Sequence, residues 1–306
     1  MVTVHREGGT PQAPAAPVPH DFLELTRRPV VRRRSIGRII GVAVVAYLAV
    51  LVAITLVTNP GFNWPVVAQY LFDTRILEGL VVTLQLTVLA MVIGFVVGLI
   101  LAVMRMSPNP LLRGAAGAYI WFFRGTPLLV QLLFWGFSAV LFPTLSIGIP
   151  FGPSLVEWDT NTVISLFAAG VLGLGLNEAA YMAEIVRGGI LSVPPGQTEA
   201  ARAMGLSHLT TLRRIVIPQA MRVIIPPVGN NVISMLKTTS LVIVIGVGDL
   251  LYNTQQIYAR NLEQIPLLIV ASIWYILLTT VLTYFQTKLE ARFSRSSSPI
   301  ATMGVR

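Results

Sequence analysis

The residue types that most often carry covalent or metal chemistry are scarce in this sequence. No cysteine occurs among the 306 residues, which excludes a disulfide scaffold, a thiolate zinc site and a cysteine nucleophile. The three histidines do not form the His-Glu-x-x-His pattern of a zinc hydrolase. The only lysines are Lys237 and Lys288, and neither follows the glycines of a nucleotide-binding P-loop, so the chain does not bind ATP in that way. We therefore expect no catalytic residue, metal or cofactor in this chain.

One short motif resembles that of a membrane enzyme. Residues 246–249 read GVGD, the Gly-x-Gly-Asp form of an intramembrane aspartyl protease. That chemistry needs a second aspartate that faces the first and shares its proton. The other aspartates all lie outside the apolar segments: Asp21, Asp73 and Asp159. The protease is therefore a remote alternative.

The composition is that of an integral membrane protein. Hydrophobic residues make up 54% of the chain, charged residues only 11%, against about 25% in a typical soluble domain, and the mean hydropathy is +0.74. The formal net charge is +9. In a membrane protein an excess of Lys and Arg is explained by cytoplasmic loops, so we expect contact with the lipid bilayer and none with nucleic acid.

Six apolar segments predict an all-α, polytopic bundle of six transmembrane helices. Each is long enough to cross a hydrocarbon core of about 30 Å as a helix. They lie near residues 39–58, 80–104, 118–142, 163–187, 228–247 and 266–287. Before them, residues 1–38 form a basic, proline-rich tail that we expect to be disordered, and residues 291–306 form a second polar tail.

The charge distribution orients these spans. With the N-terminus inside, eighteen Lys and Arg residues lie on the cytoplasmic side: seven in the tail, two in the 105–117 loop, five in 187–227 and four from Lys288 onward. Only Arg75 and Arg260 lie in outside loops. This asymmetry predicts that both termini are cytoplasmic.

The long cytoplasmic loop at residues 192–218 predicts two short helices joined by a glycine. Glu199, Ala200 and Ala201 favour the first helix, and Gly205 is in the position that commonly ends one. Ser207 is a good N-cap for the second helix, which Pro218 should end. Such a hairpin either lies on the lipid surface or docks a soluble partner.

The spacing in this loop resembles that of ABC importer permeases. Their pattern is Glu-Ala-Ala, three residues, Gly, nine residues, then Ile-x-Leu-Pro. Here Glu199-Ala200-Ala201 is followed by Gly205 and by the run Ile215-Val216-Ile217-Pro218, with Ile217 in the leucine position. Three further stretches look like the polar amino-acid branch: FRGTPLLVQ at 123–131, NEAAYMAEIVRGGI at 177–190 and KTTSL at 237–241.

The resemblance covers about residues 76–290 and implies a division of labour. The chain would be a permease subunit in the bacterial cytoplasmic membrane, paired with a second copy or a paralogue. Separate ATPase subunits would bind ATP and Mg²⁺ and dock on the hairpin, and an extracytoplasmic binding protein would deliver the amino acid. The segment at 39–58 is an extra span beyond the usual five. The coupling residues that the resemblance implies are Glu199, Ala200, Ala201, Gly205, Ser207, Ile215 and Pro218.

Polar residues within the apolar segments are candidates for the substrate path. They are Arg124, Thr126, Glu178, Asn231 and Lys237. Carboxylates inside a membrane are costly and often functional, but Glu178 could also pair with Arg124 or Lys237 for structure alone. An ion-coupled secondary amino-acid transporter is the main alternative function, although it would have no need of the Glu-Ala-Ala loop.

Overall fold

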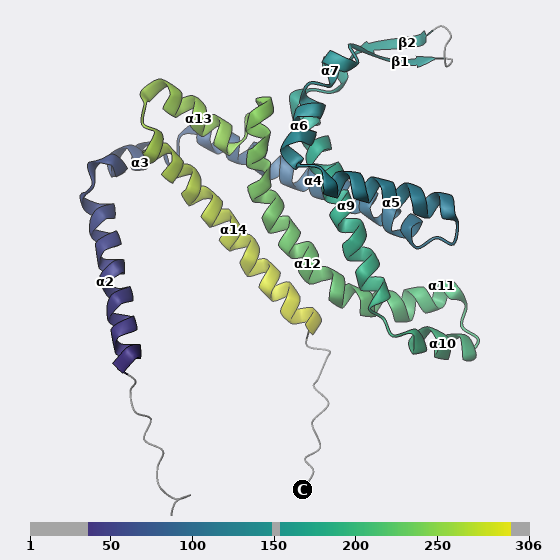
Figure 1. Ribbon diagram of the computed structural model, residues 1–306. Coiled ribbons are helices and arrows are strands. Elements are labelled where there is room, and N and C mark those ends of the chain that lie inside the picture. The colour runs from purple at the N-terminus through teal and green to yellow at the C-terminus, as the bar shows by residue number, and fades with distance from the viewer. Residues whose placement is uncertain (1–35, 149–153, 295–306) are drawn as a thin grey trace, which may run out of the picture. The chain divides into compact units, whose positions relative to one another are not determined.

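The computed structural model describes residues 36–148 and 154–294 (Figure 1). Most of the predicted N-terminal tail and of the C-terminal tail lies outside these ranges. The chain divides into two compact units, one ending at Asn59 and one beginning at Pro60. The first contains helix α2 (Ile36–Thr58), a 23-residue helix that is long and apolar enough to cross a membrane. A helix over the predicted segment 39–58 is thus confirmed.

The second unit is almost entirely helical. Its helices are η1 (Pro60–Phe62), α3 (Trp64–Tyr70), α4 (Thr74–Arg105), α5 (Pro110–Gly125), α6 (Leu128–Gly136), α7 (Ser138–Leu141), α8 (Thr160–Val163), α9 (Leu166–Leu191), α10 (Pro195–Ala203), α11 (His208–Thr211), η2 (Leu212–Val216), α12 (Ile217–Thr238), η3 (Thr239–Ile245), α13 (Leu250–Asn261) and α14 (Gln264–Ser294). Strands β1 (Thr144–Gly148) and β2 (Ser154–Asp159) form one antiparallel hairpin. The fold class predicted from hydropathy is confirmed.

Five helical stretches of the described chain are long and apolar enough to span a membrane: Ile36–Thr58, Thr74–Arg105, Leu166–Leu191, His208–Ile245 and Gln264–Phe293. The predicted span at 118–142 is not one helix, because α5 ends at Gly125 and α6 begins at Leu128. Pro127 lies in this break, where its ring fits an extended backbone. The count of six continuous spanning helices therefore stays a prediction.

The prediction that Pro218 ends the second helix of the loop was wrong. The helical stretch that begins at His208 runs on through Pro218 to Ile245. A π-helical turn, η2, stands directly before α12. A proline cannot donate the usual backbone hydrogen bond, and this wider turn lets the chain continue past it.

The core of the unit is built on close contact between α4 and α9. A Cβ atom added at Gly98 would lie 2.9 Å from the carbonyl oxygen of Ala179, and one at Gly175 would lie 2.9 Å from the Ile93 side chain. Glycines on both helices thus allow their backbones to approach, as small residues do between membrane helices.

The β-hairpin has one apolar and one polar face. Cross-strand pairs Leu145–Trp158 and Ile147–Val156 share the first face. Thr144–Asp159 and Ser146–Glu157 share the other. In Figure 1 the hairpin follows α7 and leads into α8 and α9.

Candidate functional site

The predicted helix–glycine–helix loop is present as α10, a tight turn and α11. At the end of α10, the backbone N–H of Gly205 donates to the carbonyl of Arg202 (2.9 Å) and that of Leu206 to the carbonyl of Ala201 (3.1 Å). These two bonds form a Schellman motif, which needs a left-handed residue. Gly205 supplies it with a φ of 75°. We call residues 195–216 the α10–α11 hairpin.

The second half of the turn is closed by Ser207. Its Oγ accepts a hydrogen bond from the backbone N–H of Thr210 (3.3 Å), which caps the start of α11. Ala201 is buried against the hairpin, whereas Glu199 and Ala200 are exposed. No atom outside the local backbone lies within 4 Å of a Cβ added at Gly205, so the tip of the hairpin faces open space.

The base of the hairpin is fixed to the bundle by apolar side chains. Val193, Val216, Ala220 and Ile224 form one buried cluster. Gly189 of α9 lies so close to Ile224 that an added Cβ would overlap its Cγ1. Because α11, η2, α12 and η3 are continuous, the hairpin is the end of one helical stretch that runs into the bundle.

The break between α5 and α6 is held by two buried amides. Gln131 Nε2 donates to the carbonyls of Phe123 (3.0 Å) and Thr126 (3.1 Å) and to Thr126 Oγ1 (2.7 Å). Asn177 Nδ2 donates to the carbonyl of Phe123 (3.0 Å) and to Gln131 Oε1 (3.1 Å). These bonds satisfy carbonyl groups at the end of α5 that lack helical partners, which an apolar environment requires.

Gln131 and Asn177 were given no role by the sequence reasoning. The available signal was an amide four residues after a Thr-Pro step within an apolar segment. Asn177 could not be paired with it from sequence, because 46 positions separate the two residues.

Glu178, next to Asn177, faces a different neighbour. Its carboxyl Oε1 accepts a hydrogen bond from Asn231 Nδ2 of α12 at 2.6 Å, and the residue is only 7% exposed. Gly94 of α4 packs against the Glu178 side chain, so that an added Cβ would lie 2.7 Å from Cγ. The structure thus joins Glu178 to Asn231, not to Arg124 or Lys237.

Those two cations lie elsewhere. The Arg124 guanidinium stacks over the ring of Tyr181, 5.3 Å from its centroid, and both side chains are exposed. Lys237 is exposed near the end of α12. Of the candidate substrate-path residues, only Glu178 and Asn231 contact each other directly, and Thr126 is connected to this region through Gln131 and Asn177.

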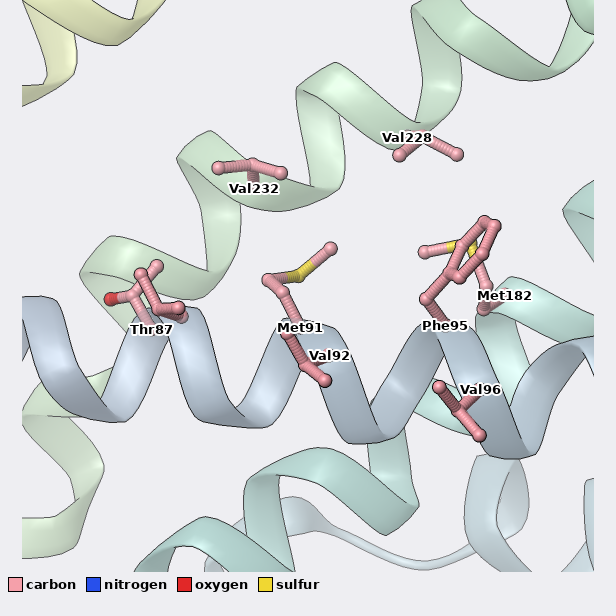
Figure 2. Close-up of a pocket in the computed structure, with 9 residues that line it drawn as sticks. Thr87, Met91, Val92, Phe95, Val96, Met182, Val228 and Val232 are labelled. Atoms are coloured by element: carbon pink, nitrogen blue, oxygen red, sulfur yellow. The ribbon is translucent and has the colours of Figure 1, made fainter.

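An apolar groove of about 420 Å³ lies between α4 and α12, and neither Glu178 nor Asn231 lines it. Figure 2 shows α4 side chains such as Met91 on one side and Val228 and Val232 of α12 on the other. Met182, one helical turn after Glu178, also lines it. The groove thus offers an almost wholly apolar surface, and the Glu178–Asn231 pair lies outside its lining.

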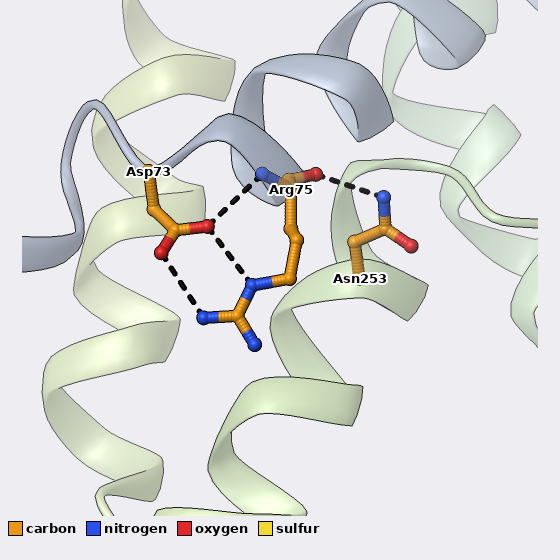
Figure 3. Close-up of polar contacts among 3 residues, drawn as sticks. All are labelled: Asp73, Arg75 and Asn253. Atoms are coloured by element: carbon orange, nitrogen blue, oxygen red, sulfur yellow. Dashed lines mark hydrogen bonds and ion pairs between the residues drawn. The ribbon is translucent and has the colours of Figure 1, made fainter.

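The described aspartates cap helices. Figure 3 shows Asp73, which accepts from the backbone N–H of Arg75 (2.9 Å) and forms an ion pair with its guanidinium (3.0 Å). The side-chain hydrogen bond from Arg75 lowers the pKa of Asp73 below its usual value. Asn253 Nδ2 donates to the Arg75 carbonyl at 2.8 Å, which connects α13 to α4. Asp159 likewise accepts the N–H of Asn161 (2.8 Å).

Asp249, the aspartate of the GVGD motif, is also a cap. Its Oδ1 accepts from the backbone N–H of Tyr252 at 2.8 Å and its Oδ2 from the Tyr275 hydroxyl at 3.5 Å. The residue is fully buried, and burial raises its pKa to about 6. Among the described residues, no group of three His, Asp or Glu side chains could hold a metal ion. The motif therefore has a structural explanation that needs no protease chemistry.

Comparison with known proteins identifies the family. The model of the binding-protein-dependent transport system inner membrane component matches residues 94–295. The chain belongs to this family. It is thus a permease component of an inner-membrane ABC transport system, and the α10–α11 hairpin and the broken α5–α6 segment lie within the matched region.

Relatives of this permease include amino-acid transport proteins. The arginine transport system permease protein ArgU of Corynebacterium glutamicum is 46% identical over 88% of this chain and 84% of its own length. The L-cystine transport system permease protein TcyB of Bacillus subtilis is 38% identical over 81% of this chain and 98% of its own. The stretch aligned with ArgU is longer than residues 76–306, so the similarity to ArgU also includes residues before position 76.

Solved structures agree on the fold. A chain from the crystal structure of an amino acid ABC transporter with histidines has a TM-score of 0.62 and 37% identity, covering 74% of this permease and 97% of that chain. A chain of the MetNI methionine ABC transporter has a TM-score of 0.58 at 19% identity, covering 72% of this permease and 97% of that chain, and supports the fold alone. The comparisons favour an ABC permease over an ion-coupled carrier or a protease.

Proposed function

We propose that this permease forms the membrane path of an ATP-driven importer for amino acids with polar side chains. The observation that carries the proposal is the α10–α11 hairpin, with a left-handed Gly205 at a tip that meets open space. A hairpin that only packed against its own bundle would bury its tip. An exposed tip on a firmly packed base is suited to enter a groove of another protein.

The partner would be an ABC ATPase that binds ATP and Mg²⁺, since the chain has no P-loop of its own. Glu199, Ala200, Ala201, Gly205 and Ser207 would form the docking surface. Ile215 and Pro218 would transmit its movement. They lie on the continuous helical stretch His208–Ile245, which runs from the tip to Asn231 in the bundle.

An extracytoplasmic binding protein would deliver the substrate, and a second permease subunit, either this chain or a paralogue, would complete the path. The names of the relatives support an amino-acid substrate: arginine, cystine and glutamine systems are among them. Glu178, Asn231 and Thr126 would supply polar contacts along the path. Arg124 and Lys237, both exposed, would meet the substrate carboxylate.

Purification of the tagged permease from native membranes in mild detergent tests the coupling. We expect a P-loop ATPase in stoichiometric amount, and its loss from the Gly205→Asp variant. Because the tip faces open space, the new side chain obstructs docking, while the left-handed backbone costs the fold only about 1–2 kcal/mol. Gly114→Asp is the control, since Gly114 of α5 also has no atom within 4 Å of an added Cβ.

Uptake into membrane vesicles separates the importer from an ion-coupled carrier. The importer requires ATP and the binding protein, and collapse of the ion gradients leaves its uptake intact. Uptake that follows an ion gradient without ATP, or full ATPase retention with normal uptake in Gly205→Asp, would contradict the proposal.

A further inference from the structure

A small pocket with both polar and apolar walls lies inside the α10–α11 hairpin itself. It has a volume of about 120 Å³ and opens between the two helices. Its lining residues are Thr198, Arg202, His208, Thr211, Leu212 and Val216. A pocket of this size suits the tip of one side chain.

The side-chain donors left in this pocket are nitrogen groups. Thr198 Oγ1 already donates to the carbonyl of Pro195 (2.7 Å), and Thr211 Oγ1 to that of Ser207 (3.0 Å). Both hydroxyl protons are therefore in use. The Arg202 guanidinium and the His208 imidazole supply the remaining side-chain N–H groups, and Arg202 forms no ion pair with any residue of the described ranges.

The floor of the pocket strengthens its preference for an anion. Thr211 and Val216 are buried and Leu212 is half-buried, whereas Arg202 and His208 are exposed. An ion pair beside apolar side chains is screened less than one in open water. The hairpin also carries an excess of positive charge: Arg202, Arg213 and Arg214 are opposed only by Glu199.

We infer that this pocket receives the carboxylate of an Asp or Glu side chain from the ATPase subunit. The inference rests on the proposed function and specifies the chemistry of the docking surface. The basic hairpin requires an acidic partner, and the volume fits one side-chain carboxylate. An arginine that presents two parallel N–H groups binds such a group in a fixed orientation. This contact would fix the rotation of the hairpin within the groove that receives it.

A zero-length cross-link tests the contact directly. The chain has only Lys237 and Lys288, so Arg202→Lys places the first amine on the hairpin. Carbodiimide joins an amine to a carboxylate that it touches. In the purified complex we expect a peptide that links position 202 to an Asp or Glu of the ATPase. Arg213→Lys is the matched control, since Arg213 is exposed on the same hairpin but does not line the pocket, and it should give far less product.

Affinity measurements provide a second readout. We expect Arg202→Gln to weaken ATPase binding by about tenfold or more and to reduce its salt dependence. Arg213→Gln should change the affinity by less than about twofold, because Arg213 does not line the pocket. The unfolding temperature of the free permease serves as the check that each variant folds.

The outcomes separate this inference from the function on which it rests. If the wild-type permease binds no P-loop ATPase, both are wrong. If it binds one but Arg202→Lys yields no cross-link to it, or a link only to this chain's own Glu199, the pocket has another role and the proposed function stands. Equal affinity and equal salt dependence of wild type and Arg202→Gln would likewise refute the pocket contact alone.

Discussion

The contact between α4 and α9 gives a sharp test of what holds the bundle together. An alanine at Gly98 would place its Cβ 2.7 Å from Met182 Cβ and 2.9 Å from the carbonyl oxygen of Ala179, where ordinary contacts begin at 3.4 Å. Another rotamer would move Met182 Cγ, but the position of its Cβ is fixed by the backbone of α9. The carbonyl belongs to the backbone of α9 and cannot turn away, so the two helices must move apart by several tenths of an ångström.

The cost can be bounded from opposing effects. Overpacking of a well-packed core costs about 1–3 kcal/mol. A gap of about 0.5–1 Å removes a quarter to a half of the dispersion attraction of each atom pair that it separates. Replacing a helical glycine with alanine returns about 1 kcal/mol from propensity. Because the separation extends along the helix contact, the loss of dispersion outweighs the gain, and we expect Gly98→Ala to be destabilised by about 1–3 kcal/mol.

Thermal unfolding of the purified permease in detergent measures this effect. At about 2–4 °C per kcal/mol, the midpoint should fall by several degrees. Gly188→Ala is the matched control: Gly188 also lies in a long helix, α9, but no atom lies within 4 Å of its added Cβ. Its midpoint should stay level or rise. If Gly98→Ala were as stable as Gly188→Ala, the α4–α9 backbone contact would not limit stability, and the reasoning would fail.

Three other substitutions test the polar groups. Glu178→Gln keeps an oxygen that accepts a hydrogen bond from Asn231, so we expect an unchanged unfolding temperature. Because the variant lacks the carboxylate, uptake should fall by about tenfold or more, and unchanged uptake would exclude a role of Glu178 on the substrate path. Gln131→Leu removes the donor to the end of α5 and should cost about 1–3 kcal/mol, visible as a lower unfolding temperature than that of the wild type; an unchanged temperature would show that this hydrogen bond does not limit stability. Burial raises the pKa of Asp249 from 3.8 to about 6, so the folded state binds more protons than the unfolded state between these two values. The free energy of unfolding should therefore increase as the pH falls from 7 to 4. Asp249→Asn should show a smaller increase, and an equal dependence on pH would refute the raised pKa of Asp249.

The long helices were predictable because their signal is local. The apolar runs at 80–104, 163–187 and 266–287 became α4, α9 and α14, each of which extends a few residues beyond the run at one or both ends. Hydropathy marks the part of a helix that prefers lipid, whereas the helical hydrogen bonds continue until a cap or a turn interrupts them. Each of these helices therefore begins and ends at residues that differ from those at which the apolar run begins and ends.

The hairpin was predictable for a related reason. Gly205 and Ser207 act on hydrogen bonds that span only three to five residues, and the turn follows from their own conformational preferences. The prediction for Pro218 was wrong because the rule that a proline ends a helix is also local. That rule assumes regular α-helical bonding, and the π-helical turn before α12 removes the assumption.

The break at Pro127 was not predicted, because the mean hydropathy of the whole segment does not reveal a break in its backbone. The segment 118–142 is apolar throughout, and apolarity measures the environment of side chains, not the continuity of backbone hydrogen bonds. The amides that make the break tolerable come from α6 and α9, and no local pattern connects Gln131 with Asn177. The packing of the helices decides which residues distant in the sequence contact each other. The sequence alone therefore predicted only part of the site.

The pairing of Glu178 with Asn231 makes sense when the two helices that carry them are considered together. A buried carboxyl could have been paired with an arginine or lysine, and breaking such a pair by removing one partner costs about 3–5 kcal/mol. A single hydrogen bond to a charged group contributes only about 1.5–3 kcal/mol. Asn231 lies on the helical stretch that begins in the α10–α11 hairpin, so in the proposed importer any movement of that stretch acts directly on this contact. If the importer works as proposed, an amide partner would be strong enough to satisfy the carboxyl and weak enough to release it, which a cation such as Arg124 or Lys237 would not be.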